Sequence, residues 1–479
     1  MLRGPRRVAA ATGGVPAGER VGTDMDCSTD FRRRRGGAPV AWLGLGLAAL
    51  AVPGAVAGGE PVAAASTVTA GDTVWVLLSA ALVMLMMPGL ALFYGGLVRK
   101  KNILSILMQC FAVLCLVSLE WVYCGYSLAF SPDFGLGLIG GLGWVGLNGV
   151  GMTPAPYAPK VPHQAFMLFQ MMFAVITPGL IIGAFAERMR FAAFCAFSVL
   201  WALLVYNPVC HWLWGAGGFM GTQGGFGAVD FAGGAVVHIN AGMAALAAVL
   251  VLGKRQGFPN NISPPHNLPL AVLGAGLLWF GWYGFNAGSA LACDGVAVNA
   301  FLVTHVAGAV AGLVWSALDW IKFGKPTTLG MITGAVAGLA AVTPGAGFVD
   351  VGGATWIGLG SGLICWFSVT ALKARYQYDD SLDAFGVHGV GGIWGTLAVG
   401  IWATQAVNPN GVNGLLHGNP AQLLAQVKAV GITMAYSFVM SYLLFRIVDF
   451  VLTLRVSAQD ERIGLDLTQH REAGYTVID

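Results

Sequence analysis

The sequence predicts an all-α polytopic membrane protein, and three observations carry this prediction. The 479-residue chain is 56% hydrophobic and only 10% charged, with a mean hydropathy of +0.72. A soluble protein of this length needs far more charge to cover its surface. Apolar runs long enough to span a bilayer, about 20 residues each, recur from residue 72 to residue 455. Finally, the 70 glycines permit the close helix packing that membrane bundles use.

The N-terminal stretch predicts a segment that is removed from the mature protein. Residues 32–59 combine a basic head, a short apolar run and a small-residue AVA site, which is the layout of a secretory signal peptide. We therefore predict a presequence over 1–57, with Met25 as an alternative start that leaves 1–24 untranslated. A retained extra helix is the other interpretation. A signal peptide of this kind indicates a bacterial origin, and the apolar runs then predict a multi-pass protein of the inner membrane.

The remaining apolar runs predict about eleven spans within a transmembrane domain over 58–455, followed by a tail over 456–479. The expected spans cover approximately 73–98, 102–130, 163–187, 191–213, 231–252, 268–289, 294–321, 328–346, 353–373, 384–404 and 423–454.

Basic residues predict the orientation of these spans. Lysine and arginine gather in alternate loops, and loops rich in these residues face the cytoplasm. The mature N-terminus is then periplasmic and the tail cytoplasmic, as an odd number of spans requires. The basic residues are scattered over short loops, so no nucleic-acid-binding patch is expected. The loops in question contain Arg99, Lys100 and Lys101; Arg188 and Arg190; Lys254 and Arg255; Lys322 and Lys325; and Lys373 and Arg375.

Two histidines interrupt very apolar segments at equivalent places. His238 lies in DFAGGAVVHINAG (230–242) on the fifth predicted span, and His388 lies in AFGVHGVGGIWG (384–395) on the tenth. A repeat unit of five helices must insert with inverted topology, so two five-helix halves are related by an axis in the membrane plane. This inverted five-plus-five repeat brings both histidines to similar depth, where they can face each other.

The pairing of these histidines favours a functional role. A single intramembrane histidine usually packs by hydrogen-bonding a neighbouring helix, and His305 fits that description. Two facing imidazoles suggest axial haem ligands, metal ligands, or a neutral hydrogen-bonded pair along a pore. No carboxylate or cysteine accompanies them to complete a metal site, whereas haem ligation stays open on spacing alone.

Aromatic residues cluster near the predicted periplasmic ends of several spans. Phe169 and Phe173 lie in FMLFQMMF (166–173), Trp214 follows in HWLWGAGG (211–218), and Ser289 ends WFGWYGFNAGS (279–289). An interfacial aromatic belt explains most single tryptophans. Together with a hydroxyl, however, ring faces can form a cage for a small cation.

These motifs resemble those of the ammonium transporter, methylammonium permease and Rhesus family, on its bacterial side. The similarity runs from about residue 72 to the end of the chain and excludes the presequence. The matching stretches are PGLALFYGGLVRKKN (88–102), GYSLAF (125–130), GAFAERMRF (183–191), DFAGGAVVHIN (230–240), PHNLP (265–269), GWYGFNAGSA (281–290), GLAAVTPGAG (338–347) and FGVHGVGGI (385–393).

The resemblance implies a non-enzymatic ammonium transporter without a cofactor. It implies a homotrimer with one pore per subunit, and a PII-type signalling protein bound at the cytoplasmic face. Ammonium would be captured at a periplasmic aromatic site and deprotonated, and ammonia would cross with or without a relayed proton. Two alternatives stay open: an ammonium sensor built on the same bundle, and a haem-bearing membrane redox subunit that uses His238 and His388. Carried over by position, the ammonium-binding residues are Trp214, Phe173, Ser289, Phe169 and Asp230, the gate is Phe173 and Phe285, the pore histidines are His238 and His388, and Trp282 and Tyr206 line the upper pore.

Three residues depart from the family pattern. Tyr283 stands where a second phenylalanine is expected, and Arg471 changes the usual sequence of the tail. Glu120 places a carboxylate in the second span. An intramembrane acid is costly unless it is paired, so Glu120 is a functional candidate. We favour the alternative that it is a protonated or hydrogen-bonded residue at the trimer interface.

Overall fold

The computed structural model describes residues 67–222, 224–260 and 263–475, so the predicted presequence (1–57) lies outside the described residues. Eleven helical segments of the described part are long and apolar enough to cross a membrane, which confirms the predicted all-α polytopic class. In chain order they are Ala70–Leu97, Lys100–Phe130, His163–Phe185, Phe191–Trp214, Gly234–Leu252, Leu268–Ala290, Gly295–Phe323, Thr328–Gly345, Val351–Tyr376, Phe385–Trp402 and Pro420–Leu452.

Five of these spans contain a π-helical turn. Such turns insert one extra residue into a helix and are frequent at functional sites. Spans two, four and nine are interrupted by η2 (Trp121–Gly125), η4 (Ala202–Tyr206) and η8 (Ser368–Leu372). Spans five and ten begin with η5 (Gly234–Ile239) and η9 (Phe385–Gly389). The turns of spans four and nine, and those of five and ten, occupy corresponding places in the two halves.

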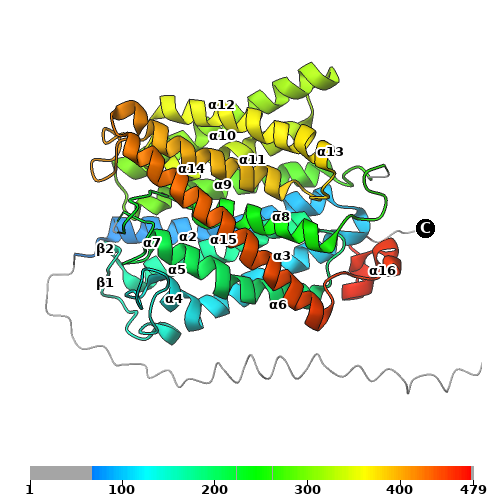
Figure 1. Ribbon diagram of the computed structural model, residues 1–479, viewed down its shortest axis with the longest axis horizontal. Helices are drawn as coiled ribbons and strands as arrows, with labels where there is room; N and C mark the ends of the chain where they lie inside the picture. Colours follow the sequence, from blue (N-terminus) through cyan, green and yellow to red (C-terminus); the bar gives the residue numbers. More distant parts are fainter. Residues whose placement is uncertain (1–66, 223, 261–262, 476–479) are drawn as a thin grey trace, which may run out of the picture. The chain divides into compact units, whose positions relative to one another are not determined.

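The elements are labelled in Figure 1. The spans are built, in order, from α2 (Ala70–Leu97); η1 (Lys100–Asn102), α3 (Ile103–Glu120), η2 and α4 (Tyr126–Phe130); α5 (His163–Phe185); α6 (Phe191–Trp201), η4 and α7 (Asn207–Trp214); η5 and α8 (Asn240–Leu252); α9 (Leu268–Ala287) and η6 (Gly288–Ala290); α10 (Gly295–Phe323); α11 (Thr328–Val342) and η7 (Thr343–Gly345); α12 (Val351–Phe367), η8 and α13 (Lys373–Tyr376); η9 and α14 (Val390–Trp402); and α15 (Pro420–Leu452).

Short elements lie at the two ends of the bundle. A two-stranded antiparallel sheet of β1 (Pro154–Ala155) and β2 (Ala158–Pro162) precedes α5, with Pro154 paired to Pro162. Figure 1 shows it at the end opposite α16 (Ala458–Ile463). The remaining short helices are η3 (Val145–Leu147), η10 (Leu415–His417) and η11 (Asp466–His470).

Small residues let the first span of each half pack closely. Helix α2 lies against α9, the sixth span, over much of its length. Gly274 of α9 sits directly on the backbone of Phe93 in α2. Lipid gives apolar helices no hydrophobic drive to associate, so van der Waals contact between close backbones holds such pairs together.

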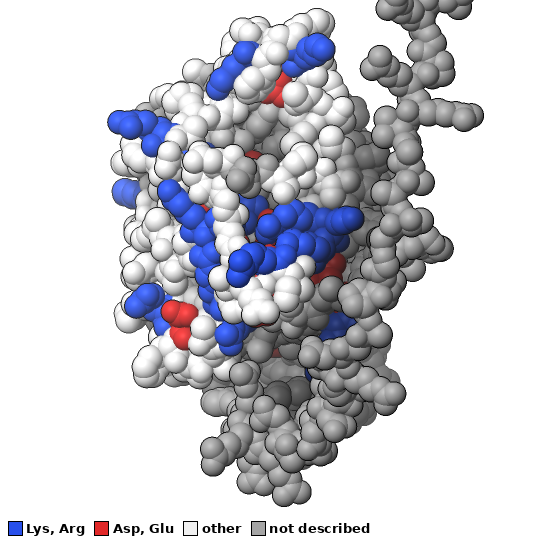
Figure 2. All heavy atoms as spheres, turned by 90° about the vertical axis from the view of Figure 1, so that its right-hand side faces the viewer, with Lys and Arg blue, Asp and Glu red and all other residues white. Residues whose placement is uncertain are grey.

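The basic loops meet on one face, which we call the basic face. Figure 2 shows lysine and arginine gathered over it with few acidic residues between them. The tail packs on the same face. The Leu465 amide donates to the Asn102 side-chain oxygen at 2.8 Å, and the Ser105 amide donates to the Asp466 carboxylate at 2.8 Å. The basic loops, which alternate along the chain, thus lie at the same end of the bundle, as the order of the predicted spans requires.

Candidate functional site

Two π-helical turns carry the predicted pore histidines, His238 in η5 and His388 in η9. An aspartate stands eight residues before each histidine, Asp230 in one half and Asp380 in the other. The Asp230 carboxylate accepts four backbone N–H bonds of 2.6–3.1 Å at the start of η5. The Asp380 carboxylate accepts two at the start of η9. Because free N–H groups at a helix start favour a negative partner, both turns are held in the same way.

Asp230 acts mainly on the backbone. Burial raises the pKa of its carboxyl group, and the four N–H donors offset part of that rise. Both oxygens are occupied by these bonds. Asp230 therefore fixes the path of the chain just before His238.

The two histidine rings face each other, as predicted. Their centroids are 5.3 Å apart and the ring planes differ by 11°. The backbones that carry them also meet closely, because a Cβ atom on Gly242 would lie 2.1 Å from the Cα of Gly389. Any side chain at Gly242 would push the two helices apart and separate the rings.

Four aromatic rings form a cluster that reaches the histidine pair through Phe285, whose ring lies 6.1 Å from that of His238. The ring of Phe173 lies 4.3 Å from that of Phe285 and 5.8 Å from that of Trp214, the latter at 88°. Phe169 packs edge-on against Phe173 at 4.9 Å. The Trp214 indole N–H donates to the Asp230 carbonyl at 2.7 Å, which fixes the orientation of the ring. We call this group the aromatic site.

Ser289 is bonded to the backbone of Phe285, one member of the aromatic site. It lies in η6, one turn after Phe285, and its hydroxyl donates to the Phe285 carbonyl at 2.9 Å. The proton of the hydroxyl is therefore engaged, whereas its lone pairs remain available. Ring faces with one adjacent acceptor oxygen suit a small cation that can donate a hydrogen bond.

A narrow cavity of about 10 Å³ lies against both histidines. Both ring nitrogens of His238 and the Nδ1 of His388 have no hydrogen-bond partner among the described residues. Such a volume holds about one water-sized molecule, so a haem does not fit between these rings. The other lining residues are Met86, Leu90, Phe93, Ile176, Leu180, Val237, Leu278, Trp282, Phe285 and Val336.

His388 also borders a second, wider cavity of about 260 Å³. Its polar lining includes Arg255, Asp319 and Asp383, in contrast to the apolar wall of the narrow cavity. Arg255 lies on the basic face, so we call this space the basic-face vestibule. His388 therefore lies between an apolar cavity and a polar one.

The two other predicted pore residues, Trp282 and Tyr206, differ in their position. Trp282 stacks on His238 with centroids 5.5 Å apart, and its indole N–H donates to the Thr343 hydroxyl at 2.9 Å. Tyr206 is fully buried against Trp121, with ring centroids 6.1 Å apart, and is not among the residues that line the narrow cavity. Of the predicted site residues, His238, His388, Trp282 and Phe285 line the narrow cavity, and Tyr206 does not.

His305 lies apart from the histidine pair. Its Nδ1 hydrogen-bonds the Tyr283 hydroxyl at 2.7 Å, and Tyr283 stacks on Phe301 with centroids 3.9 Å apart. The hydrogen bond to Tyr283 agrees with the interpretation that His305 bonds a neighbouring helix. It also accounts for the unexpected tyrosine, since phenylalanine has no group to donate or accept this bond.

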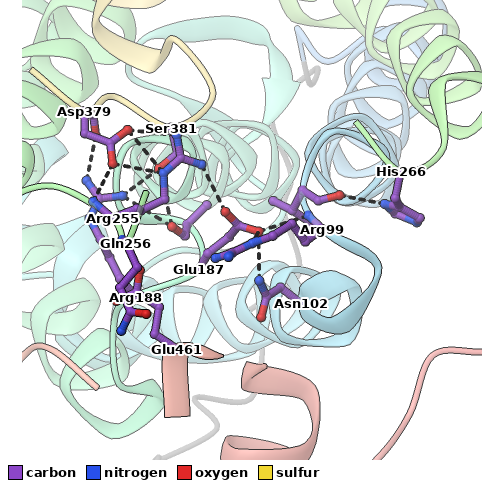
Figure 3. Close-up of polar contacts among 12 residues, drawn as sticks. Arg99, Asn102, Glu187, Arg188, Arg255, Gln256, His266, Asp379, Ser381 and Glu461 are labelled. Carbon is purple, nitrogen blue, oxygen red and sulfur yellow. Dashed lines mark hydrogen bonds and ion pairs between the residues drawn. The ribbon is translucent and has the colours of Figure 1, made fainter. Parts of the chain in front are cut away.

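A buried ionic network joins four of the connecting loops on the basic face, and sequence reasoning missed it (Figure 3). Glu187 bonds Arg99 at 2.8 Å and Arg255 at 3.0 Å, and Arg255 also bonds Asp379 at 2.8 Å. The fully buried Arg188 donates to the Asp379 carbonyl at 2.7 Å. Only the excess of charged residues in these short loops could have signalled it. We call these five residues the basic-face network.

Charge pairing keeps both carboxylates of this network ionised. Burial raises the pKa of Glu187, but Arg99 and Arg255 more than offset that effect, and the pKa is lowered. Burial likewise raises the pKa of Asp379, and Arg255 reverses the shift. Opposite charges within a few ångströms favour the charged form of each group. The contribution of the basic-face network to folding stability therefore depends on both carboxylates being ionised.

Fold and site together define a class of protein: a polytopic membrane protein with a narrow apolar passage between an aromatic site and a polar vestibule. Comparison with known proteins identifies the family within this class. Residues 74–475 match the model of the Ammonium Transporter Family. The chain is 51% identical over 405 residues to the ammonium transporter of Bacillus subtilis, covering 85% of this chain and 98% of the relative. It is 48% identical over 406 residues to the ammonium transporter Amt1 of Archaeoglobus fulgidus, covering 85% and 99%.

Solved structures agree. The crystal structure of Saccharomyces cerevisiae Mep2 matches with a TM-score of 0.77 at 34% identity, covering 82% of this chain and 89% of Mep2. A structure titled Sensor Amt Protein matches with a TM-score of 0.76 at 30% identity, covering 84% and 98%. The chain belongs to the ammonium transporter family, and the resemblance inferred from its motifs is confirmed.

Proposed function

We propose that this chain transports ammonium across a bacterial inner membrane. Trp214, Phe173 and Ser289, with Phe169 beside them, capture the cation at the aromatic site. The cation loses its proton near Phe173 and Phe285, and ammonia passes His238 and His388 into the basic-face vestibule. The observation that carries this proposal is the narrow cavity, in which the two histidines supply the only unpartnered polar atoms of the lining within the described chain.

The apolar wall explains selectivity. Moving a monovalent ion into a dry passage carries a large desolvation cost, whereas neutral ammonia avoids most of it. Sodium and potassium have no proton to lose, so they stay at the aromatic site or outside it. Facing imidazoles offer ammonia both lone pairs and N–H groups, and they can also relay the released proton.

Uptake of labelled methylammonium tests the proposed transport. We expect cells that lack their own ammonium transporters to gain uptake when they produce this chain, and ammonium to compete with the label. A protein that serves as a sensor would bind ammonium without adding uptake. Absence of uptake in cells that hold the folded protein in their membranes would contradict the proposal.

We further propose a homotrimer with a periplasmic N-terminus, a cytoplasmic tail, and a PII-type signalling protein as partner. Basic residues gather on one face (Figure 2), and the tail bonds to Asn102 and Ser105 beside the basic loop at 99–101, which supports this orientation. The docking surface would consist of the loops at 100–102 and 253–258 together with the tail.

Sided membrane vesicles test the orientation and the partner together. We expect a PII protein to sediment with inside-out vesicles that contain this chain and not with right-side-out vesicles. Binding to right-side-out vesicles would contradict the orientation, and binding to neither under any nucleotide condition would contradict the partner. Native mass spectrometry of the detergent-solubilised protein measures the trimer.

A further inference from the structure

A second polar group lies inside the bundle, and the proposed transport does not use it. Glu120 ends α3 within span two and is 8% exposed. One of its oxygens, Oε1, accepts a bond of 2.8 Å from the side-chain nitrogen of Asn207 in span four. None of the ion pairs in the described part of the chain involves Glu120. Its partner is an amide of the same subunit, so burial of Glu120 does not need a neighbouring subunit.

Two atoms of this pair are left without partners. The second carboxyl oxygen of Glu120, Oε2, and the amide oxygen of Asn207, Oδ1, are both buried and unpartnered among the described residues. Both atoms are acceptors when Glu120 is ionised, so neither can satisfy the other. A buried polar atom left unpaired costs about 1–3 kcal/mol, and an ionised acid within a membrane span costs more.

One proton on the Glu120 carboxyl group would give both unpartnered atoms a partner. A protonated carboxyl group has an O–H donor, and an amide oxygen accepts it. Asn207 Nδ2 already donates to Glu120 Oε1 at 2.8 Å, and the added O–H on Oε2 is the donor that Asn207 Oδ1 lacks. We propose that Glu120 is held as a neutral carboxylic acid by Asn207, and that this acid–amide pair positions the pore wall.

Two π-helical turns build the place for this pair. Glu120 immediately precedes η2, and Asn207 immediately follows η4. A Cβ atom on Gly125 would lie 2.6 Å from both carboxyl oxygens of Glu120, so the acid fits only because residue 125 is glycine.

The pair is joined to the proposed transport path through span four. Tyr206 ends η4 next to Asn207 and packs against Trp121 of η2. Helix α7 runs on from Asn207 to Trp214, which belongs to the aromatic site. Glu120 is therefore a positioning residue: it links span two to the segment that carries Trp214, and it adds no charge to the pore wall.

Substitutions separate a neutral acid from a charged one, given that the chain transports methylammonium as proposed. Glu120→Gln retains an amide that can pair with Asn207, so we expect at least half of the wild-type uptake. Glu120→Leu and Asn207→Leu each remove the pair, and we expect uptake to fall at least fivefold. Uptake by the double leucine variant should be no lower than uptake by the less active single variant, because the effects of two residues in one contact are not additive. Leu119→Ala, at the adjacent outward-facing residue, is the matched control.

Infrared spectroscopy tests the protonation state without using transport. The difference spectrum between wild type and Glu120→Gln at neutral pH should show the carbonyl stretch of one protonated carboxylic acid, and Asn207→Leu should shift that band. Loss of a carboxylate band instead, or uptake by Glu120→Gln as low as by Glu120→Leu, would overturn the inference. Wild-type protein without uptake would refute the proposed transport, yet the infrared result would still decide the state of Glu120.

Discussion

Replacing His388 by aspartate is expected to make the passage conduct potassium. The carboxylate would stand between the narrow cavity and the basic-face vestibule, where it draws in water and neutralises a passing cation. A unit charge about 4 Å from a cation contributes about 4 kcal/mol at an effective dielectric constant of 20. Such a gain corresponds to about a thousandfold in rate. Potassium flux through purified protein in liposomes measures the change, and His238→Glu should act in the same way.

Alanine at the same position should give the opposite pattern. His388→Ala removes the relay without supplying a charge, so we expect methylammonium transport to fall at least tenfold while potassium stays excluded. His305→Ala is the matched control, because that histidine bonds Tyr283 away from the passage. If the histidines served only packing, all variants at His238 and His388 would lose folded protein together and keep their ion preference. Unchanged selectivity in both carboxylate variants would therefore refute the filter.

The class of fold could be predicted from composition, because spans are long and apolar and their number follows from counting. The facing of His238 and His388 was also predictable, since their places in spans five and ten imply an inverted repeat. The aspartate eight residues before each histidine is visible in the sequence. However, only the structure shows that both aspartates bond to π-helical turns. Apolar residues of the same kinds form π and α turns, so the sequence does not distinguish the two.

Other parts of the site could not be predicted because they depend on contacts distant in sequence. Tyr206 belongs to the expected pore set, yet its ring packs behind the wall against Trp121. The extra residue in η4 rotates the following part of span four, and so decides which of its residues point to the passage. The apolar periodicity of the sequence does not reveal this rotation. Asn207 likewise gives no signal by itself as the partner of Glu120, 87 residues away.

The basic-face network is the clearest case of such distant contacts, and it carries a stability prediction. Glu187→Gln is expected to destabilise the folded protein by about 3–5 kcal/mol, the usual cost of removing one partner from a buried ion pair. Glutamine has one acceptor oxygen, whereas Glu187 uses both of its oxygens for Arg99, Asn102 and Arg255. The apparent melting temperature in detergent measures the loss. Glu472→Gln, an exposed change of equal charge in the tail, should shift stability by less than about 0.5 kcal/mol.

The pH dependence of this loss distinguishes a charge effect from a packing effect. The folded-state pKa values of Glu187 and Asp379 are lowered, so their contribution is fully present above the unfolded values of about 4. That contribution disappears as the pH falls through the folded values. Wild-type melting temperature should therefore drop below about pH 4, and the gap to Glu187→Gln should narrow there because Glu187 itself becomes neutral. A gap that stays constant from pH 7 to pH 3 would show that glutamine disturbs packing alone, and that the charges of the network contribute nothing to stability.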